Sequence, residues 1–184
     1  QELKTSNNYC NHENPTGIFV KEGERIAVIV EGITDYPVGM KIRNFGPTVF
    51  AESNYTLSNG VNIITASNRG NIYVNYYTND FAKAPNVKIH FAMCTENGYF
   101  DLTKGMTNDD WKKIINNATG DCMDLLGYHC QVNFPAATLK KNCKDAVWLV
   151  NTYDSIVSSE FRMMGLYEYN RVYGNHMTVI CVAK

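Results

Sequence analysis

The sequence predicts an α+β fold in which an N-terminal antiparallel β-sandwich is followed by a part that mixes helices and strands. Up to residue 97, short runs of β-branched and aromatic residues recur every roughly 8–12 residues without a helical period. From residue 98 onward, apolar residues recur at intervals of three and four, as in amphipathic helices. Residues 1–97 and 98–184 are therefore predicted to be two parts that pack together, because no flexible linker separates them.

Six short runs predict the strands of the sandwich, over residues 17–20, 25–30, 40–45, 61–65, 72–77 and 87–93. The first two runs are separated by Lys21-Glu22-Gly23-Glu24, so they are predicted to pair as a hairpin with glycine in its loop. Asn68-Arg69-Gly70-Asn71 predicts another turn, between the fourth run and the fifth.

Capping residues predict where the second part begins to be helical. The Thr107 side chain is spaced to accept a hydrogen bond from the backbone N–H of Asp110. The Asp110 carboxylate is spaced to accept one in return from the backbone N–H of Thr107, as in a capping box. Gly120 is a suitable stop for this helix. Periodicity then predicts, in order, a strand over residues 128–134, a short helix over 135–141, a long helix over 146–164 and a strand over 176–183.

Charge and hydropathy argue against several kinds of partner. The formal net charge is −1 and like charges form no run, whereas a nucleic-acid binder normally shows a basic face. No apolar stretch approaches the ~20 residues that cross a bilayer, so no transmembrane segment is predicted. The polar start, Gln1-Glu2-Leu3-Lys4, is interpreted either as a mature end left after signal removal or as a cloning boundary.

The six cysteines leave two interpretations open. An even number fits disulfides formed in an oxidising compartment, whereas free cysteines are also among the residues most often buried. A metal cluster of Cys122, His129, Cys130 and Cys143 is not favoured, because its spacing matches no common zinc knuckle.

No complete catalytic constellation is found in the sequence. The four histidines lie at positions 12, 90, 129 and 176, so no two are four residues apart as in a zinc-binding His-Glu-x-x-His helix. A nucleophile elbow, a phosphate loop and a Cys-x-x-Cys pair are also missing. No catalytic residue and no metal ligand are therefore assigned. A carboxylate pair drawn from Asp101, Asp124, Asp154 and Glu160 is kept as a further hypothesis, that of an independent glycoside hydrolase.

Aromatic side chains are the remaining candidates for substrate binding. Tyr73 and Tyr77 fall on one face of a predicted strand, where their rings could stack on sugars. A carbohydrate-binding or adhesin-type sandwich without enzymatic activity is therefore the alternative function. His176, at the start of the last predicted strand, is a third candidate, whereas Trp111 and Trp148 are predicted to be core residues of helices.

Several segments, taken in order, resemble one family. They are Pro15-Thr16-Gly17-Ile18-Phe19-Val20-Lys21-Glu22-Gly23-Glu24, Gly98-Tyr99-Phe100-Asp101-Leu102-Thr103, Asn108-Asp109-Asp110-Trp111, Phe134-Pro135 with Leu139, Tyr153-Asp154, and Met164-Gly165-Leu166. Their order and spacing resemble the N-terminal portion of the enhancin-like, mucin-degrading zinc metallopeptidases, over residues 15–184.

This resemblance implies a β-sandwich that leads into the first half of a gluzincin-type catalytic domain. It also implies a secreted or cell-surface enzyme that cleaves glycoproteins such as mucins. In the family, a His-Glu-x-x-His helix and a downstream glutamate hold zinc, and the motif glutamate serves as the general base.

The zinc helix is expected after the strand at residues 176–183, where the sequence ends. No ligand can then be carried over to these residues, so zinc is expected only in the full-length family member. The chain is interpreted as a fragment or natural remnant that lacks the C-terminal half of the catalytic domain and is inert alone, because a catalytic zinc needs about three protein ligands. The strand at residues 176–183 is either an edge near the substrate cleft or an interior strand.

Overall fold

The computed structural model describes residues 10–11, 13–45, 50–78, 82–172 and 174–180, and within them the predicted α+β class is confirmed. The strands are β1 Cys10–Asn11, β2 Glu13–Val20, β3 Arg25–Glu31, β4 Val38–Phe45, β5 Phe50–Leu57, β6 Gly60–Thr65, β7 Gly70–Tyr76, β8 Lys88–Ala92, β9 Thr95–Glu96, β10 Phe100–Asp101, β11 Cys122–Leu126, β12 Cys130–Pro135 and β13 His176–Ile180. The helical segments are the 3₁₀ turn η1 Leu102–Lys104, α1 Asn108–Asn117, α2 Ala136–Asn142 and α3 Ala146–Met163.

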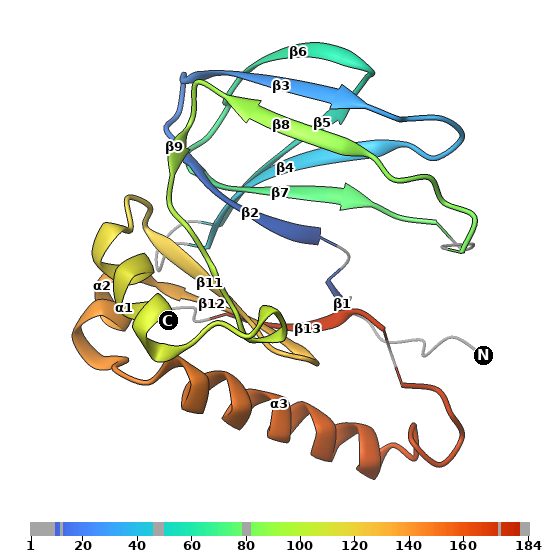
Figure 1. Ribbon diagram of the computed structural model, residues 1–184, viewed down its shortest axis with the longest axis vertical. Helices are drawn as coiled ribbons and strands as arrows, with labels where there is room; N and C mark the ends of the chain where they lie inside the picture. The colour runs from blue at the N-terminus through green and yellow to red at the C-terminus, as the bar shows by residue number, and fades with distance from the viewer. Residues whose placement is uncertain (1–9, 12, 46–49, 79–81, 173, 181–184) are drawn as a thin grey trace.

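The described strands form three sheets that stack in layers (Figure 1). Sheet C has the order β6-β3-β8 and is the outermost layer. Sheet B, with the order β5-β4-β7-β2-β9, packs against it to complete the sandwich. Sheet A, with the order β1-β13-β12-β11-β10, lies below sheet B, and α3 runs across the far side of sheet A.

The sandwich core is built from the alternate residues of its strands that point between sheets B and C. Fully buried examples are Val28 and Val30 of β3, Met40 and Ile42 of β4, and Ile72 of β7. Because side chains alternate along a strand, the residues between them point to the outer faces of the two sheets. Those outer faces carry the features discussed below.

The predicted hairpin of residues 17–30 is wrong. β2 pairs with β7 and β9 in sheet B, whereas β3 pairs with β6 and β8 in sheet C. The intervening turn is tight, since the N–H of Glu24 donates to the carbonyl of Lys21 at 3.1 Å, but it carries the chain across the sandwich. A tight turn shows that the chain reverses, and it does not show that the flanking strands bond to each other.

The helical predictions of the second part are confirmed in kind and in position. At α1, both hydrogen bonds of the capping box between Thr107 and Asp110 are present. Trp111 is fully buried, and its ring N–H donates to the carbonyl of Cys143 at 2.9 Å. The sequence did not indicate β11, and the strand predicted over residues 128–134 begins at Cys130, after a turn.

Trp148 is not the core residue that was predicted, because 65% of its surface is exposed. The buried face of α3 contains Val150, Val157 and Phe161, which pack on sheet A. Trp148 precedes Val150 by two residues, or about 200° around the helix, so it points away from this face. Ile156, six residues after Val150, is also away from the buried face of α3 and is 48% exposed.

Candidate functional site

The described residues offer no set of ligands for a catalytic zinc. Among them, no three His, Cys, Asp or Glu side chains lie close enough to hold a metal ion. His90 lies exposed on β8, and His129 packs edge-on against Phe161 with 5.6 Å between ring centroids. His12 lies outside the described residues. No step of a zinc-dependent reaction is therefore assigned to this part of the chain.

His176 fastens the start of β13 to the turn between β11 and β12. Its Nε2 atom lies 2.9 Å from the carbonyl oxygen of Gly127, and the next residue, Met177, donates its N–H to the carbonyl of His129 at 2.7 Å. The side chain is half-buried. His176 therefore has a structural contact in this structure, at the start of the last described strand of sheet A.

Strand β13 combines the two placements that the sequence left open. β12 pairs with it in parallel from Met177 to Ile180, whereas β1 pairs with it only at His176 and Met177. In the described part of the chain, the start of β13 is thus interior and its continuation from Thr178 has strand pairing on one side. The last predicted residues of this strand, 181–183, lie outside the described residues.

Asp154 organises the turn that contacts His176. From α3, its carboxylate accepts hydrogen bonds from the backbone N–H groups of Tyr128, His129 and Cys130, at 2.7, 2.9 and 3.0 Å. Position 127 has room only for glycine, because a Cβ there would lie 2.4 Å from a carboxylate oxygen of Asp154. Asp154 thus ties α3 to the β11–β12 turn, and through that turn to β13.

A second buried carboxylate, Asp124, joins the sandwich to sheet A. Its four donors are the Asn71 and Asn133 amides at 3.2 and 2.9 Å, the Tyr73 hydroxyl at 2.8 Å and the Gln131 amide at 3.1 Å. Asn71 and Tyr73 come from β7 of sheet B, whereas the others lie on sheet A. Burial raises the pKa of the Asp124 carboxyl, while these hydrogen bonds act to lower it.

Asn97 completes the junction between sandwich and sheet A. Its side-chain oxygen accepts from the backbone N–H groups of Thr119 and Gly120, at 3.0 and 2.7 Å. Its amide donates to the carbonyl of Cys122 at 3.0 Å. The boundary between the two predicted parts is therefore a buried, hydrogen-bonded junction.

The scattered carboxylates do not form a glycosidase-like pair in this structure. Asp101 accepts from the Thr103 N–H and hydroxyl at 3.0 and 2.6 Å and caps η1. Asp124 and Asp154 are each held by separate sets of donors, and Glu160 is exposed on α3. The three buried groups therefore have structural partners of their own, and the hypothesis of an independent glycoside hydrolase gains no support.

The structure separates the two tyrosines proposed as a sugar platform. Tyr73 is 1% exposed and its hydroxyl is bonded to Asp124, so sheet A covers the face on which a sugar would stack. Burial raises the pKa of Tyr73 well above its ordinary value. Tyr77, which follows β7, is 54% exposed. The paired platform is therefore corrected, and Tyr77 remains a candidate by itself.

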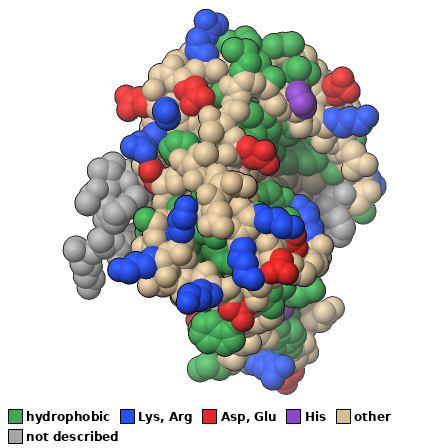
Figure 2. All heavy atoms as spheres, turned by 60° about the vertical axis from the view of Figure 1, so that its left-hand side comes forward, with side chains coloured by type: hydrophobic (Ala, Val, Ile, Leu, Met, Phe, Trp, Pro, Cys, Tyr) green, Lys and Arg blue, Asp and Glu red, His purple; other side chains and the backbone are tan. Residues whose placement is uncertain are grey.

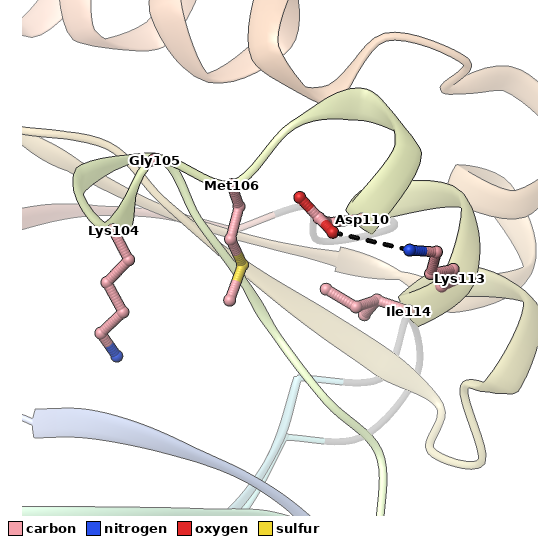
Figure 3. Close-up of a pocket in the computed structure, with 6 residues that line it drawn as sticks. All are labelled: Lys104, Gly105, Met106, Asp110, Lys113 and Ile114. Atoms are coloured by element: carbon pink, nitrogen blue, oxygen red, sulfur yellow. Dashed lines mark ion pairs between the residues drawn. The ribbon is translucent and has the colours of Figure 1, made fainter.

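A pocket of about 360 Å³ lies beside η1 and the start of α1, lined by Lys104, Gly105, Met106, Asp110, Lys113 and Ile114 (Figure 3). Its polar groups already have local partners. Lys104 donates to the Tyr99 hydroxyl at 2.5 Å, a contact that raises the pKa of its amine, and Asp110 caps α1. Lys113 lies 3.9 Å from Asp110. The pocket contains none of the predicted site residues.

Cys94, Cys122, Cys130 and Cys143 are not joined in disulfides in this structure. Cys122 and Cys130 are buried, whereas Cys94 and Cys143 are half-buried. Cys122 lies on the sandwich side of sheet A and Cys130 in the core beneath α3, so they belong to different packing layers. Burial raises the pKa of Cys94, Cys130 and Cys143, which makes these thiols weak nucleophiles.

Residues 2–90 match the family model described as the N-terminal domain of M60-like peptidases. These residues belong to the M60-like peptidase family. The sequence-based recognition of a metallopeptidase family through its N-terminal portion is thus confirmed. No curated protein sequence matches the chain.

Solved structures share the fold over nearly the whole chain. A metallopeptidase from Bacteroides thetaiotaomicron matches with a TM-score of 0.82 and 24% identity, covering 95% of this chain and 34% of that one. A metallopeptidase in complex with Tn antigen matches with 0.81 and 25%, covering 92% and 34%. The M60 catalytic domain of Clostridium perfringens ZmpC, in complex with the sialyl T antigen, matches with 0.77 and 17%, covering 93% and 40%.

The chain therefore spans about a third to two-fifths of the length of these solved structures. Its sandwich and its helix-covered sheet A both fall within the matched region. No helix in the described ranges is both long and apolar enough to span a membrane. On the face shown in Figure 2, positive and negative side chains are interspersed rather than gathered into a field of one sign.

Proposed function

We propose that the chain is the N-terminal part of a secreted or cell-surface zinc metallopeptidase that acts on glycoproteins such as mucins. The family match supports the peptidase class. Two similar solved structures hold Tn antigen and sialyl T antigen, which supports a glycosylated substrate. The division into residues 1–97 and 98–184 is kept as part of this proposal.

The zinc of this enzyme is proposed to bind to residues that are not among these 184. The sequence has no histidine pair four residues apart, and the described side chains form no metal cluster. When bound, zinc would polarise the scissile carbonyl and activate a water molecule. The residues present here would position the substrate and support the catalytic helix, and would not take part in the chemistry themselves.

Strand β13 is the observation that carries this proposal. Its start is held in place by His176 and, through the β11–β12 turn, by Asp154 of α3. β12 pairs with it in parallel from Met177 to Ile180, and β1 pairs with it at His176 and Met177. An extended substrate segment could add to this strand through backbone hydrogen bonds, which recognise a peptide independently of its side chains.

The proposal is tested by comparing the 184-residue chain with a longer chain translated from the nucleotide sequence beyond the codon for Lys184. We expect a His-Glu-x-x-His motif within roughly a hundred further residues, a distance that allows the zinc helix and its support to follow β13. The longer chain should bind about one zinc per molecule and cleave an O-glycosylated mucin until a chelator is added.

The 184-residue chain serves as the matched control in this experiment. It is expected to contain no stoichiometric zinc by elemental analysis and to leave the mucin intact. Chelator-sensitive proteolysis by the 184-residue chain, with stoichiometric zinc, would contradict the placement of the metal site. A longer chain without the motif, without zinc and without activity would contradict the peptidase proposal itself.

The alternative of a non-enzymatic carbohydrate-binding sandwich retains Tyr77 as its exposed aromatic candidate, because Tyr73 is buried. Mucin-glycan arrays probed with the intact chain and with Tyr77→Ala distinguish the two functions. Binding that disappears in the variant would favour the alternative. If neither protein bound any glycan on the array, the carbohydrate-binding alternative would be wrong, and glycan contact would be expected from other parts of the enzyme.

A further inference from the structure

The outward face of sheet C carries a contiguous apolar patch. On β6, Val61 and Ile63 are 67% and 56% exposed, and on β3, Ile29 is 37% exposed. The strand register makes these residues neighbours, since Ile29 lies opposite Val61, and Ala27 lies opposite Ile63 on one side and Ala92 on the other. Five apolar side chains therefore cover the middle of this three-stranded sheet, together with the exposed His90, which lies opposite Ile29 on β8.

This pattern departs from what a sandwich needs for its own stability. The outer face of an antiparallel sheet normally alternates to polar residues, and the inward residues of β3, Ile26, Val28 and Val30, already supply its share of the core. Single exposed apolar residues are common on protein surfaces, whereas a contiguous patch with charged ends is typical of an interface.

The ends of β3 carry opposite charges on this same face. Arg25 and Glu31 are both exposed, and the outward residues between them are Ala27 and Ile29. The outward sequence of β3 is thus positive, apolar, apolar, negative. If the β3 strand of a second copy lies over this strand in the opposite direction, Arg25 of each copy faces Glu31 of the other. Ala27 of each copy then faces Ile29 of the other. Lys88 lies opposite Glu31 on β8 and adds positive charge beside it.

We propose that the outward face of sheet C binds the same face of a second copy of this chain, around a two-fold axis that sets the two β3 strands antiparallel. Such an interface is isologous, so each contact occurs twice. Sheets pack face to face with their strands within about 30° of each other, which keeps the apolar rows of the two copies in contact.

The size of the patch sets the strength of this association. Three strands about 4.8 Å apart, with seven residues at about 3.4 Å each, give a face of roughly 14 by 24 Å. Two such faces bury roughly 700 Å², which is below the area of a standard stable interface. The dimer is therefore weak and reversible, with a Kd of roughly 10–500 μM.

Sedimentation velocity of the 184-residue chain over roughly 10–500 μM, the range of the expected Kd, measures this association. The weight-average mass should rise from monomer toward dimer across this range. Ile63→Lys places a charge at the centre of the interface and should weaken association tenfold or more. Trp148→Lys, at an equally exposed apolar position on α3, is the matched control and should leave the monomer–dimer equilibrium unchanged.

Charge reversal tests the antiparallel arrangement itself. Arg25→Glu would bring two carboxylates together at each end of the interface, and Glu31→Arg would bring two guanidinium groups together there. Each of these variants alone should therefore stay monomeric. In an equimolar mixture of the two variants, one end joins the two introduced charges and the other joins the two native ones, and both pairs are opposite in sign. The mixture should therefore form a heterodimer, and the double variant Arg25→Glu/Glu31→Arg should form a homodimer for the same reason.

All variants alter exposed side chains, so circular dichroism should confirm an unchanged fold. A wild-type chain that stays monomeric up to 500 μM would overturn the proposal. Association that survives Ile63→Lys and is lost in Trp148→Lys would place the interface on α3 instead and would also overturn it. If Arg25→Glu and Glu31→Arg formed no heterodimer when mixed, the antiparallel arrangement of the two β3 strands would be wrong.

Discussion

Replacing Asp124 with leucine is expected to lower the free energy of unfolding by about 3–5 kcal/mol. The variant keeps the branched shape of the side chain, in a somewhat larger volume, but removes the acceptor of four buried donors, on Asn71, Tyr73, Gln131 and Asn133. Two of these donors belong to sheet B and two to sheet A, so the loss weakens the junction between the sandwich and sheet A. Urea denaturation followed by circular dichroism measures the change.

Two other variants calibrate this result. Tyr73→Phe removes the hydroxyl that donates to Asp124 and accepts from the Asn133 amide, and should cost about 1–2 kcal/mol, because the ring remains packed. Asp109→Ala removes a carboxylate that is exposed on α1, where its ion pair with Lys112 is open to solvent, and should not change stability measurably. If Asp124→Leu cost no more than Tyr73→Phe, the carboxylate would not be the centre of the junction.

The pH dependence of stability tests the charge state of Asp124. Burial raises the pKa of its carboxyl in the folded protein, and in the unfolded chain the value is about 3.9. The unfolded state therefore loses its proton first as the pH rises. The contribution of the protonated Asp124 carboxyl to the free energy of unfolding is fully present below about pH 4. This contribution is lost as the pH rises through the folded-state pKa. Relative to the non-titrating variant Asp124→Asn, the wild-type protein should become less stable over this range, and a rise would contradict the raised pKa.

The parts of the fold that depend on neighbouring residues could be predicted from the sequence. The capping box of Thr107 and Asp110 is a local pattern, and so α1 begins where predicted. The long helix α3 was recognised from its apolar stripe, whose core contains Val150, Val157 and Phe161. In both cases the contacts that decide the structure lie within one helix or on one of its faces.

The parts that depend on distant segments could not be predicted. Tyr73 has the alternation of a surface residue, but β11 of sheet A, more than forty residues later in the chain, covers it. Strand β11 is buried on both faces and has Asp124 in its middle, so it shows neither alternation nor a purely apolar run. The strands flanking the turn at Gly23 follow one another closely, yet their partners are elsewhere in the chain.

The candidate site was predictable only in outline. The lack of a His-Glu-x-x-His motif follows from the spacing of the histidines in the sequence. His176 was a substrate-binding candidate because it begins the last predicted strand. The role of Asp154 could not be deduced, because its three donors lie about 25 residues earlier, in a turn that was assigned to a strand. Gly127, just before those donors, was the local signal of a close approach.

Asp154→Ala is expected to lower the free energy of unfolding by about 3–4 kcal/mol and to loosen the start of β13. The variant leaves the N–H groups of Tyr128, His129 and Cys130 without their acceptor, in a region that α3 shields from water. Because the same turn provides the carbonyls that bind His176 and Met177, its disorder should spread to the strand. Hydrogen exchange should show lost protection at residues 127–130 and 176–180.

Three further variants separate the loss of the hydrogen bonds to Asp154 from a general effect on α3. Glu160→Ala changes an exposed carboxylate of the same helix and should leave protection of the turn unaltered. Asp154→Asn keeps one acceptor oxygen and should retain part of the lost stability, whereas Gly127→Ala should reproduce the loss by forcing a methyl group against the carboxylate. Unchanged exchange at residues 176–180 in Asp154→Ala would mean that β13 is held by its pairing with β12 alone, and the proposed support of the substrate strand by α3 would then be wrong.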